Sequence, residues 1–494
     1  MRDFDVIVAG GGPAGIMAAL AAAKVGVKVL IIEQNGFLGG ASTAMSTGPV
    51  SPFHFRNEQV VKGIPQQFMD ALVAAKGSTG HMKTLDPYGS GDSLGFFDRE
   101  KYKLVAATML EDAGVRMLFH SFISGVSLNG KTVTGVTVTN KSGLRTYSSS
   151  IVIDATGDGD VAVMAGAEYI KGEKDSGLMQ PCSAMFEMAN VDESKLYRYV
   201  LDHPEEFEWK TDAIPLRAFD SRLKKNYFVI QGFKTLVQQA MDSGELRFGR
   251  NSLLMLNGVN PHSMHFNSTR ITGIDATDAE QLTKGELLGR NQIDSVSEFC
   301  IKYMPGFEHS YVSRTSSYLG VRETRHIIGE YILNTEDVVA GRKFSDVVSR
   351  GYFPIDIHSY SSPNGYDEGG GSWVTLQDTY DIPYRSLVPR TVDGLVLSGR
   401  VISGTSGAHG SYRTQGGIMG IGQASGIAAA MCVLDNEQPR YLEVKKLQKK
   451  LISFGASVYR DPEAMEKEEA IARKAVENFL ATHKEFITDP TKIQ

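Results

Sequence analysis

One histidine and one arginine stand four residues apart in the stretch GTSGAHGSYRTQGG, residues 404–417. Arg413 carries a planar guanidinium, which can bind a carboxylate through two parallel hydrogen bonds. His409 has an ordinary pKa near neutrality, so it can exchange a proton at physiological pH. Five of the fourteen residues are glycine, which lets the backbone approach a neighbouring group closely. The pattern predicts a site that binds a polar group and moves a proton. A purely structural role is also open, in which His409 caps a helix and Arg413 bonds a phosphate or the backbone.

Further polar residues between positions 320 and 385 are candidates for the same site. GVRETR places Arg322 and Arg325 on a predicted strand, where alternation directs them to opposite faces, and we expect Arg322 to reach the site. Arg325 would then pair with Glu323 or face solvent. IDIH puts Asp356 and His358 on one strand face, either as a carboxylate–imidazole pair or as a structural hydrogen bond. With Tyr384, from YDIPYRS, the catalytic candidates are His409, Arg413, Arg322, His358 and Tyr384.

The elements that must position these residues begin at the N-terminus. FDVIVAG is typical of a buried parallel strand, IMAALAAAKVG predicts a helix, and VKVLIIE predicts a second strand that ends at Glu33. Between the first strand and the helix, Gly10, Gly12 and Gly15 form GxGxxG, which in this context predicts a dinucleotide-binding turn. The helix N-terminus would supply amide donors to a pyrophosphate. Glu33 is placed to accept from ribose hydroxyls, and its carboxylate disfavours a 2′-phosphate.

Two further segments favour FAD over NAD. Residues 39–43 read GGAST directly after the second strand, where a nicotinamide dehydrogenase needs no further glycine-rich turn. Residues 115–157 read as strands joined by turns at Asn129-Gly130 and Ser142-Gly143. They close on a buried strand that runs into ATG at 155–157. A three-stranded meander ending in ATG is a usual second landmark of FAD-binding folds.

Taken together, these stretches resemble the FAD-dependent oxidoreductases related to fumarate reductase flavoproteins and other glutathione-reductase-type folds. The resemblance also rests on LGVRETRHIIGEYILNTEDV, FPIDIH, YDIPYRSLVPRTVDGLVLSGRVISGTSGAHGSYR and GIGQASGIAAA. It implies an α/β fold: a Rossmann-like FAD-binding domain, with a parallel sheet and a three-stranded meander, and an inserted α+β substrate domain. It places the glycine-rich stretch at 404–417 against the isoalloxazine, with the N-terminal amides of the following helix directed at the flavin. Fumarate-reductase-like proteins have a similar His-Gly-x-x-Arg that holds a substrate carboxylate.

The residues expected to contact FAD come from four glycine-rich segments. They are Gly10, Gly12, Pro13, Ala14, Gly15, Glu33, Gln34, Gly39, Gly40, Ala41, Ser42, Ala155, Thr156, Gly157, Gly399, Arg400, Gly416, Gly417 and Ile418. No metal site is expected, because Cys182, Cys300 and Cys432 stand far apart and no Cys/His cluster occurs. His54 in PFHF is a weaker candidate for covalent attachment of the flavin.

The nucleotide-binding domain is expected to be discontinuous, with residues 1–175 and 380–435 flanking a substrate-binding domain at 176–379. A helix is expected near 278–303, and a helical tail at 436–494. From about residue 463 the tail has a charged amphipathic pattern that predicts packing on the surface or on a partner subunit, which leaves a homo-oligomer open.

The composition narrows the partners and the compartment. The chain has 494 residues, 42% hydrophobic and 22% charged, with a net charge of −6 and no long basic run. A nucleic-acid or anionic-membrane partner is therefore not expected. A strand from about the fifth residue leaves no room for a signal peptide, and lysines interrupt the apolar stretch that follows, so we expect no membrane span and a cytoplasmic protein.

The predicted activity is hydride transfer between flavin N5 and a carbon of a small polar organic substrate. We expect dehydrogenation of an alcohol or amine, with reduction of an activated C=C bond in an unsaturated carboxylate as the alternative. A flavin monooxygenase and a non-catalytic FAD-binding protein are two further candidates, although no second GxGxxG unit marks an NAD(P)H site. The sequence does not name the substrate or the electron donor or acceptor.

Overall fold

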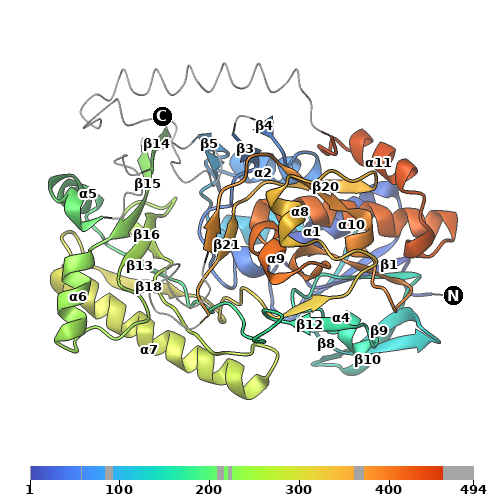
Figure 1. Ribbon diagram of the computed structural model, residues 1–494, viewed down its shortest axis with the longest axis horizontal. Helices are drawn as coiled ribbons and strands as arrows, with labels where there is room; N and C mark the ends of the chain where they lie inside the picture. The colour runs from blue at the N-terminus through green and yellow to red at the C-terminus, as the bar shows by residue number, and fades with distance from the viewer. Residues whose placement is uncertain are drawn as a thin grey trace.

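Five parallel strands form the sheet that carries the glycine-rich turns, in the order β24-β11-β1-β2-β7. Figure 1 labels β1, the central strand of this sheet. The computed structural model describes residues 2–56, 58–83, 93–207, 216–220, 225–360 and 372–459. The last strand in the chain pairs with β11, so the C-terminal part returns to the sheet that the N-terminus begins. The strands are β1 (Val6–Ala9), β2 (Val29–Ile32), β7 (Arg116–Leu118), β11 (Ile151–Asp154) and β24 (Leu395–Leu397).

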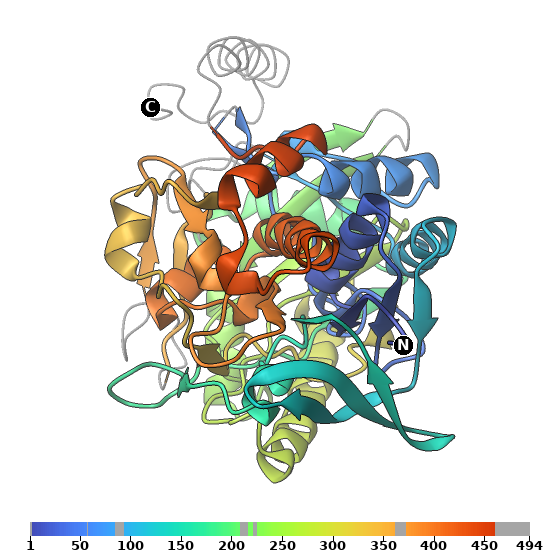
Figure 2. The same ribbon diagram turned by 90° about the vertical axis from the view of Figure 1, so that its right-hand side faces the viewer.

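Two long helices pack together on this sheet. The helix α1 (Pro13–Val25) begins with proline in its first turn and ends at Gly26, whose φ of 110° is left-handed. It lies against α10 (Gln415–Asp435), and Figure 2 looks along α10 with α1 beside it. A Cβ on Gly422 or Gly426 of α10 would overlap the backbone of α1, so these glycines allow the two helices to approach closely. The other helices of this part are α2 (Ile64–Ala74), α3 (Arg99–Asp112), α4 (Asp160–Met164), α8 (Thr335–Val339), α9 (Ser406–Tyr412) and α11 (Val444–Ser453).

The predicted meander is present as three antiparallel strands. The strands β8 (Phe122–Asn129), β9 (Thr132–Asn140) and β10 (Gly143–Ser148) pair in the order β10-β9-β8. Both predicted turns contain a glycine with positive φ, 61° at Gly130 and 88° at Gly143. The chain then enters β11 and the ATG segment, as the sequence predicts.

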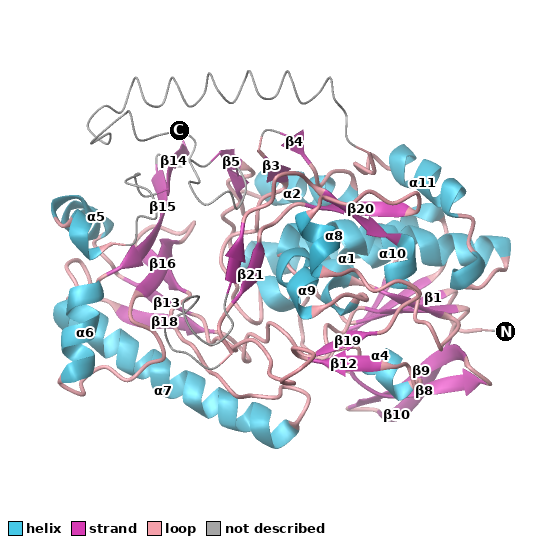
Figure 3. Ribbon diagram, viewed as in Figure 1, coloured by secondary structure: helices cyan, strands magenta, loops and turns pink. Residues whose placement is uncertain are grey.

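A second, antiparallel sheet with its own helices forms the inserted α+β part (Figure 3). Its strand order is β14-β15-β16-β17-β13-β18, and the long helix α7 corresponds to the helix predicted near 278–303. The strands are β13 (Phe186–Ala189), β14 (Leu216–Asp220), β15 (Lys225–Gly232), β16 (Leu253–Asn257), β17 (Ser263–Phe266) and β18 (Tyr311–Thr315). The helices are α5 (Glu193–Asp202), α6 (Lys234–Asp242) and α7 (Ala279–Tyr303).

Two hydrophobic cores divide the chain at a different place from the predicted boundary at 379. The core of the inserted sheet takes buried side chains from Cys182 to Val321. Buried residues from Ile327 onward, including Val347, Tyr352 and Tyr380, belong instead to the core of the parallel sheet. The core packing therefore returns to the nucleotide-binding part well before residue 380, because β20 (Val347–Gly351) packs on α10.

Short strand pairs connect the two parts. The strand predicted over RETRHIIGEYIL is confined to β19 (Arg325–Ile327), which pairs with β12 (Tyr169–Lys171), so Arg322 lies in the loop before it. The remaining pairs are β20 (Val347–Gly351) with β23 (Tyr380–Pro383), β21 (Ile355–Ile357) with β22 (Ser372–Val374), β3 (His54–Phe55) with β4 (Glu58–Gln59), and β5 (Met82–Lys83) with β6 (Ser93–Leu94). Most of the predicted tail, from residue 460 on, lies outside the described residues.

One described helix, α10, is long and apolar enough to cross a membrane by length and composition. In this structure 83% of its most apolar window is buried inside the protein, where it packs on α1.

Candidate active site

The three glycines of GxGxxG have three different environments. A Cβ on Gly10, whose φ is 104°, would meet the carbonyl of Ala155, and one on Gly15 would overlap the carbonyl oxygen of Gly10. A Cβ on Gly12 would meet no atom within 4 Å. The turn is thus packed against protein at Gly10 and Gly15 and open at Gly12. It lies at the carboxyl end of β1, and dinucleotides bind at the carboxyl ends of the strands in parallel sheets of this kind. These residues fit the pyrophosphate of FAD.

Glu33, which follows β2, lies beside this turn. Its Oε2 accepts from Gly11 N at 2.8 Å, and its Oε1 accepts from Asn35 N at 2.9 Å and Asn35 Nδ2 at 2.6 Å. Burial raises the pKa of Glu33, and the hydrogen bonds from Asn35 and Gly11 oppose that rise. The carboxylate therefore fixes the glycine turn, and its contact with a ribose stays a prediction. Gln34, another expected FAD contact, follows it in the chain.

Replacing Glu33 with alanine is expected to weaken FAD binding by about 1–2 kcal/mol, or roughly 5–30-fold in Kd. The reason is that one charged acceptor is lost and the Gly11 amide loses its partner. Fluorescence titration of the apoprotein with FAD measures the change. Glu111→Ala, an exposed position on α3, is the matched control and should leave Kd unchanged. An unaltered Kd in the Glu33 variant would contradict the role of this carboxylate.

The segment at 39–51 joins the dinucleotide turn to the start of α10. Gly39 N donates to Gly11 O at 2.8 Å, and the 3-10 turn at Gly40–Ser42 follows. Ser42 Oγ donates to Gln415 Oε1 at 3.1 Å, and Gly416 N donates to Ser51 Oγ at 2.9 Å. The structure thus brings together the glycine clusters at the two ends of the chain. The other expected FAD contacts lie in the same region. Pro13 and Ala14 begin α1, and Gly399 packs on Ala14. Ala41 lies in the 3-10 turn, and Gly417 and Ile418 lie in the first turn of α10.

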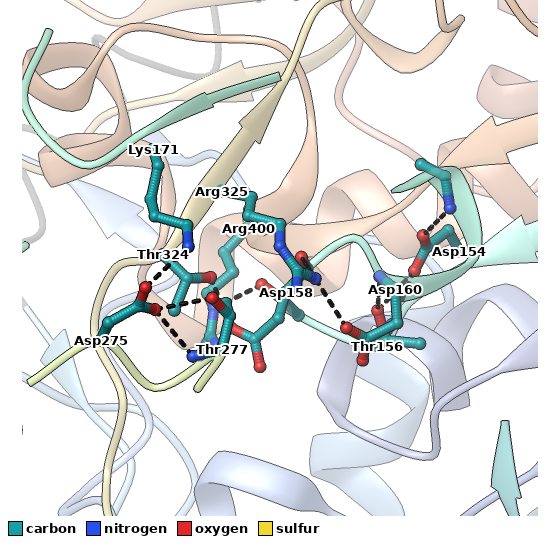
Figure 4. A network of polar contacts seen from close by, with 12 residues as sticks. Asp154, Thr156, Asp158, Asp160, Lys171, Asp275, Thr277, Thr324, Arg325 and Arg400 are labelled. Atoms are coloured by element: carbon teal, nitrogen blue, oxygen red, sulfur yellow. Dashed lines mark hydrogen bonds and ion pairs between the residues drawn. The ribbon is translucent and has the colours of Figure 1, made fainter. Parts of the chain in front are cut away.

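A polar network at the end of β11 holds the ATG segment (Figure 4). Asp154 Oδ1 accepts from Thr156 Oγ1 at 2.7 Å, and Gly157 beyond it has a φ of 87°. Arg400 donates through Nε to Gly157 O at 2.7 Å and through its other two nitrogens to Val321 O at 2.7 Å and Asp158 Oδ1 at 2.6 Å. All three nitrogens of Arg400 bond to protein. Arg400 therefore positions the loop on which the expected contacts Ala155, Thr156 and Gly157 lie.

The five glycines at 404–417 lie close to other parts of the protein, and the expected contact of Gly416 and Gly417 with the flavin stays a prediction. A Cβ at each would crowd a protein atom: Gly404 and Gly417 against Tyr412, Gly407 against Thr335, Gly410 against the Asp356 carbonyl, and Gly416 against Tyr352 and Pro52. Sequence composition cannot distinguish close approach to a ligand from close approach to a neighbouring chain segment. The result of this packing is that α9, which carries His409, sits tightly on β21 and α8.

His409 is 2% exposed, and its Nδ1 finds no hydrogen-bond partner among the described residues. Its ring meets that of His326 edge-on, with centroids 4.9 Å apart and planes at 89°. Burial lowers the pKa of His409 well below its usual value, and the nearby His326, Arg413 and Arg400 lower it further. The imidazole is therefore neutral at physiological pH, with one ring nitrogen unused.

A buried histidine–glutamate pair, His326 and Glu323, lies next to His409 and was not predicted from the sequence. His326 Nε2 and Glu323 Oε1 are 2.9 Å apart, Ser406 Oγ donates to the same oxygen, and Gln180 N donates to Oε2 at 3.1 Å. Burial opposes ionisation of Glu323, but these hydrogen bonds outweigh it and keep its pKa below the usual value. The expected pairing of Glu323 with an arginine is thus wrong: Arg325 bonds Asp158 O and Asp160 Oδ1 instead.

Arg413, Asp356 and His358 form a contiguous group. Arg413 NH2 donates to Asp356 O at 2.9 Å and to Asp356 Oδ2 at 3.1 Å, and His358 Nε2 lies 3.4 Å from Asp356 Oδ1. Arg322 NH1 donates to Pro181 O at 2.6 Å and to Ser183 Oγ at 2.7 Å, and the charge of Arg413 acts on it. Four of the five catalytic candidates, His409, Arg413, Arg322 and His358, are therefore brought together.

Tyr384 is the exception. Its side chain is buried, and its hydroxyl donates to Pro439 O at 2.8 Å, on the side of the C-terminal segment. Its position before the last strand made it a candidate, but that position buries it in the core of the parallel sheet. His54 Nδ1 bonds Ser93 Oγ at 2.8 Å. Among the described residues, no group of three or more His, Cys, Asp or Glu side chains is placed to hold a metal ion.

Comparison with known proteins agrees with the geometry of the dinucleotide turn. Residues 5–451 match the family described as FAD dependent oxidoreductase. The chain belongs to this family. It is therefore an FAD-dependent oxidoreductase, an enzyme whose cofactor is FAD. This membership also removes the non-catalytic FAD-binding protein from the candidates.

Individual relatives of this oxidoreductase match smaller parts of it. Thiamine thiazole synthase of Aeropyrum pernix is 32% identical over 170 residues, 33% of this chain and 58% of that protein. Digeranylgeranylglycerophospholipid reductase 1 of Methanococcoides burtonii is 26% identical over 204 residues, 40% of this chain and 49% of that protein. The chain thus spans about half the length of these curated relatives. A geranylgeranyl bacteriochlorophyll reductase-like structure from Thermoplasma acidophilum covers 99% of this chain and 89% of its own, at 16% identity and a TM-score of 0.39.

Proposed function

We propose that this oxidoreductase dehydrogenates an alcohol or amine carbon of a small polar substrate, with His409 as the base. The observation that carries the proposal is a buried, neutral histidine with an unpartnered ring nitrogen, one helical turn from Arg413. FAD, when bound, supplies the acceptor for the hydride at N5. The hydroxyl or amine proton passes to the imidazole of His409, and the carbon that loses the hydride becomes a carbonyl or imine.

The surrounding residues hold His409 and the substrate in place. The glycines of α9 and its surroundings fix the helix against β21, so the imidazole has little freedom to move. Arg413 lies one helical turn from His409, and its charge acts on Arg322, so the two guanidinium groups are suited to hold an acidic or polar substituent of the substrate. The ring of His326, backed by Glu323, restricts the orientation of His409.

Reduction of a C=C bond in an unsaturated carboxylate is the second candidate, because the two arginines would also suit its carboxylate. That reaction needs an acid to protonate carbon, whereas the lowered pKa of His409 leaves it unprotonated at neutral pH. The protonation state thus favours dehydrogenation. A cytoplasmic location remains part of the proposal, and the buried free thiols of Cys182, Cys300 and Cys432 suit a reducing compartment.

The test is to follow the absorbance of the bound flavin anaerobically while hydroxy acids, polyols, amines and enoates are added one class at a time. Bleaching by a hydroxy or amino compound supports the proposal. Reoxidation of pre-reduced flavin by enoates alone would select the C=C reductase. Bleaching by NAD(P)H alone, followed on oxygen addition by a hydroperoxyflavin absorbance, would select the monooxygenase.

The pH dependence of flavin reduction follows from the lowered pKa of His409. A base acts in its unprotonated form, which is present above its pKa. Since burial moves that pKa well below 6.5, the rate of flavin reduction should stay constant from pH 8 to 6.5 and fall only at lower pH. Stopped-flow measurement at saturating substrate tests this. A fall in rate with an apparent pKa at or above 6.5 would exclude His409 as the base.

A further inference from the structure

In the proposed reaction, a proton that reaches His409 has to leave it again before the next turnover. His409 is buried, and burial is the main reason why its pKa lies well below the usual value. The basic residues His326, Arg413 and Arg400 lower this pKa further. The protonated form of His409 is therefore unfavourable at neutral pH, and a second group close by has to take the proton on.

The ring of His326 is in contact with His409 and is held in one protonation pattern by Glu323. The two imidazoles meet edge-on, with centroids 4.9 Å apart, and His326 Nε2 lies 2.9 Å from Glu323 Oε1. Despite burial, the hydrogen bonds that Glu323 accepts keep its pKa below the usual value, so it is ionised at neutral pH. An ionised carboxylate can only accept a hydrogen bond, so neutral His326 carries its proton on Nε2. Its Nδ1, which has no partner among the described residues, is left as a proton acceptor.

From Glu323 the hydrogen bonds continue toward the surface. Ser406 Oγ donates to Glu323 Oε1, the same oxygen that His326 contacts. Tyr360 Oη lies 3.0 Å from Ser406 Oγ, and burial raises the pKa of Tyr360 to about 12, so its hydroxyl stays protonated. His326 and Glu323 are buried, whereas Ser406 is half-buried and follows the exposed Thr405 at the start of α9. We call the four hydrogen-bonded residues, His326, Glu323, Ser406 and Tyr360, the proton chain.

We propose that the proton chain carries the substrate proton from His409 to solvent. This inference rests on the proposed function, because in that function His409 is the group that takes the proton from the substrate. The hydride leaves separately for the flavin, so one proton has to travel along the chain in each turnover. Gln180 N, which donates to Glu323 Oε2 at 3.1 Å, holds the carboxylate in place while its other oxygen serves His326 and Ser406.

Each step along the proton chain makes one bond to hydrogen and breaks one. His409 gives its proton to His326 Nδ1 across the edge-on contact, directly or through one water, and the proton on His326 Nε2 moves to Glu323 Oε1. The Ser406 hydroxyl turns its own hydrogen toward Tyr360 or solvent, releases that hydrogen and accepts the proton from Glu323. The chain is reset when the hydroxyl turns back and His326 returns to its starting tautomer.

Exchange of the His326 Nε2 proton with water tests the proton chain without a substrate. It is measured by NMR on FAD-loaded enzyme labelled with nitrogen-15 in its histidine rings, and the His326 signal is assigned by its absence in His326→Asn. Ser406→Ala should slow this exchange roughly tenfold or more, with the flavin still bound, because it removes the link between Glu323 and the surface. Thr405→Ala is the matched control: it removes the neighbouring hydroxyl, which caps α9 and lies outside the chain, and should not slow the exchange.

Proton release during flavin reduction is the second measurement. In an anaerobic single turnover with a bleaching substrate, flavin absorbance follows hydride transfer, and a pH-indicator dye in weak buffer follows the proton that reaches solvent. The two signals should keep pace in the native enzyme and in the control Glu168→Gln, which alters an exposed carboxylate. In Glu323→Gln the proton should lag behind bleaching by roughly tenfold or more, because the amide cannot take the proton from His326. A merely structural role of Glu323 would instead change the flavin content or both rates together. Should Glu323→Gln fail to fold, Ser406→Ala is used in the same measurement.

Two outcomes would overturn the inference: exchange of the His326 proton at the same rate in the native enzyme and in Ser406→Ala, or proton release that keeps pace with bleaching in the chain variants. Failure of the proposed function looks different. If the exchange depends on Ser406 but no hydroxy or amino compound ever bleaches the flavin, the path from His326 to the surface stands and dehydrogenation fails. If a compound bleaches the flavin while exchange and release are the same in every chain variant, dehydrogenation stands and the proton chain fails.

Discussion

Replacing His409 with alanine is expected to leave FAD bound and to slow reduction of the flavin by substrate by about 10²–10⁴-fold, the usual cost of removing a general base. The Nδ1 of His409 has no partner among the described residues, so its loss breaks no hydrogen bond there, although the cavity that the buried ring leaves lowers stability. The fall in rate that is expected below pH 6.5 in the native enzyme should disappear in the variant. Single-turnover bleaching, together with the amount of flavin per chain, measures both effects.

Arg413→Lys is the companion variant, because lysine keeps the charge but cannot form a two-pronged contact. It should chiefly raise the half-saturating substrate concentration, whereas His409→Ala should chiefly lower the limiting rate. If both variants lose flavin and stability together, these residues hold the fold and have no catalytic role. If both stay yellow and fully active, the catalytic groups lie elsewhere in the site.

A methyl group at Gly422 is expected to destabilise the enzyme by about 1–3 kcal/mol and to weaken FAD binding. The added Cβ of Gly422→Ala would overlap the carbonyl oxygen of Ala14, in the first turn of α1. Since α1 follows the dinucleotide turn, separating α1 from α10 would move the amides that we expect to bind the pyrophosphate. Thermal or urea unfolding and FAD titration measure the two consequences.

Gly420→Ala is the matched control two residues away on the same helix. Its Cβ would meet Ser349 Oγ at 2.8 Å, the end of a side chain that can rotate, and no backbone atom within 4 Å. Both variants gain helix propensity of up to ~1 kcal/mol, so a difference between them isolates the contact with α1. Equal stability of the two variants would contradict the close packing of α1 on α10.

The dinucleotide-binding half could be predicted because its signals are local. The buried strands, the GxGxxG turn and the glycines at 130 and 143 each follow from a few adjacent residues, and all lie where expected. The helix α7 could also be predicted, because it begins at an aspartate cap and continues through a long periodic stretch.

The site residues could be predicted only where they stand close together in one short segment of the sequence. His409 and Arg413 share one segment, and they stand together in the structure as their spacing suggests. His326 and Gln180 come from segments far apart in the chain, so no motif in the sequence predicts that both bond Glu323. The glycines at 404–417 were recognised as sites of close approach, but their neighbours are protein atoms that only the folded chain supplies.

The most direct measurement of the central claim compares a bleaching substrate with its isotopologue carrying deuterium on the carbon next to the hydroxyl or amine. The account predicts that anaerobic flavin reduction in a single turnover is slower with the deuterated compound, because the C–H bond breaks as its hydride leaves, and that His409→Ala is slow with both. Reduction at equal rates with both isotopologues in a stopped-flow experiment, with binding already saturated and the His409 variant unimpaired, would contradict hydride transfer from a substrate deprotonated by His409.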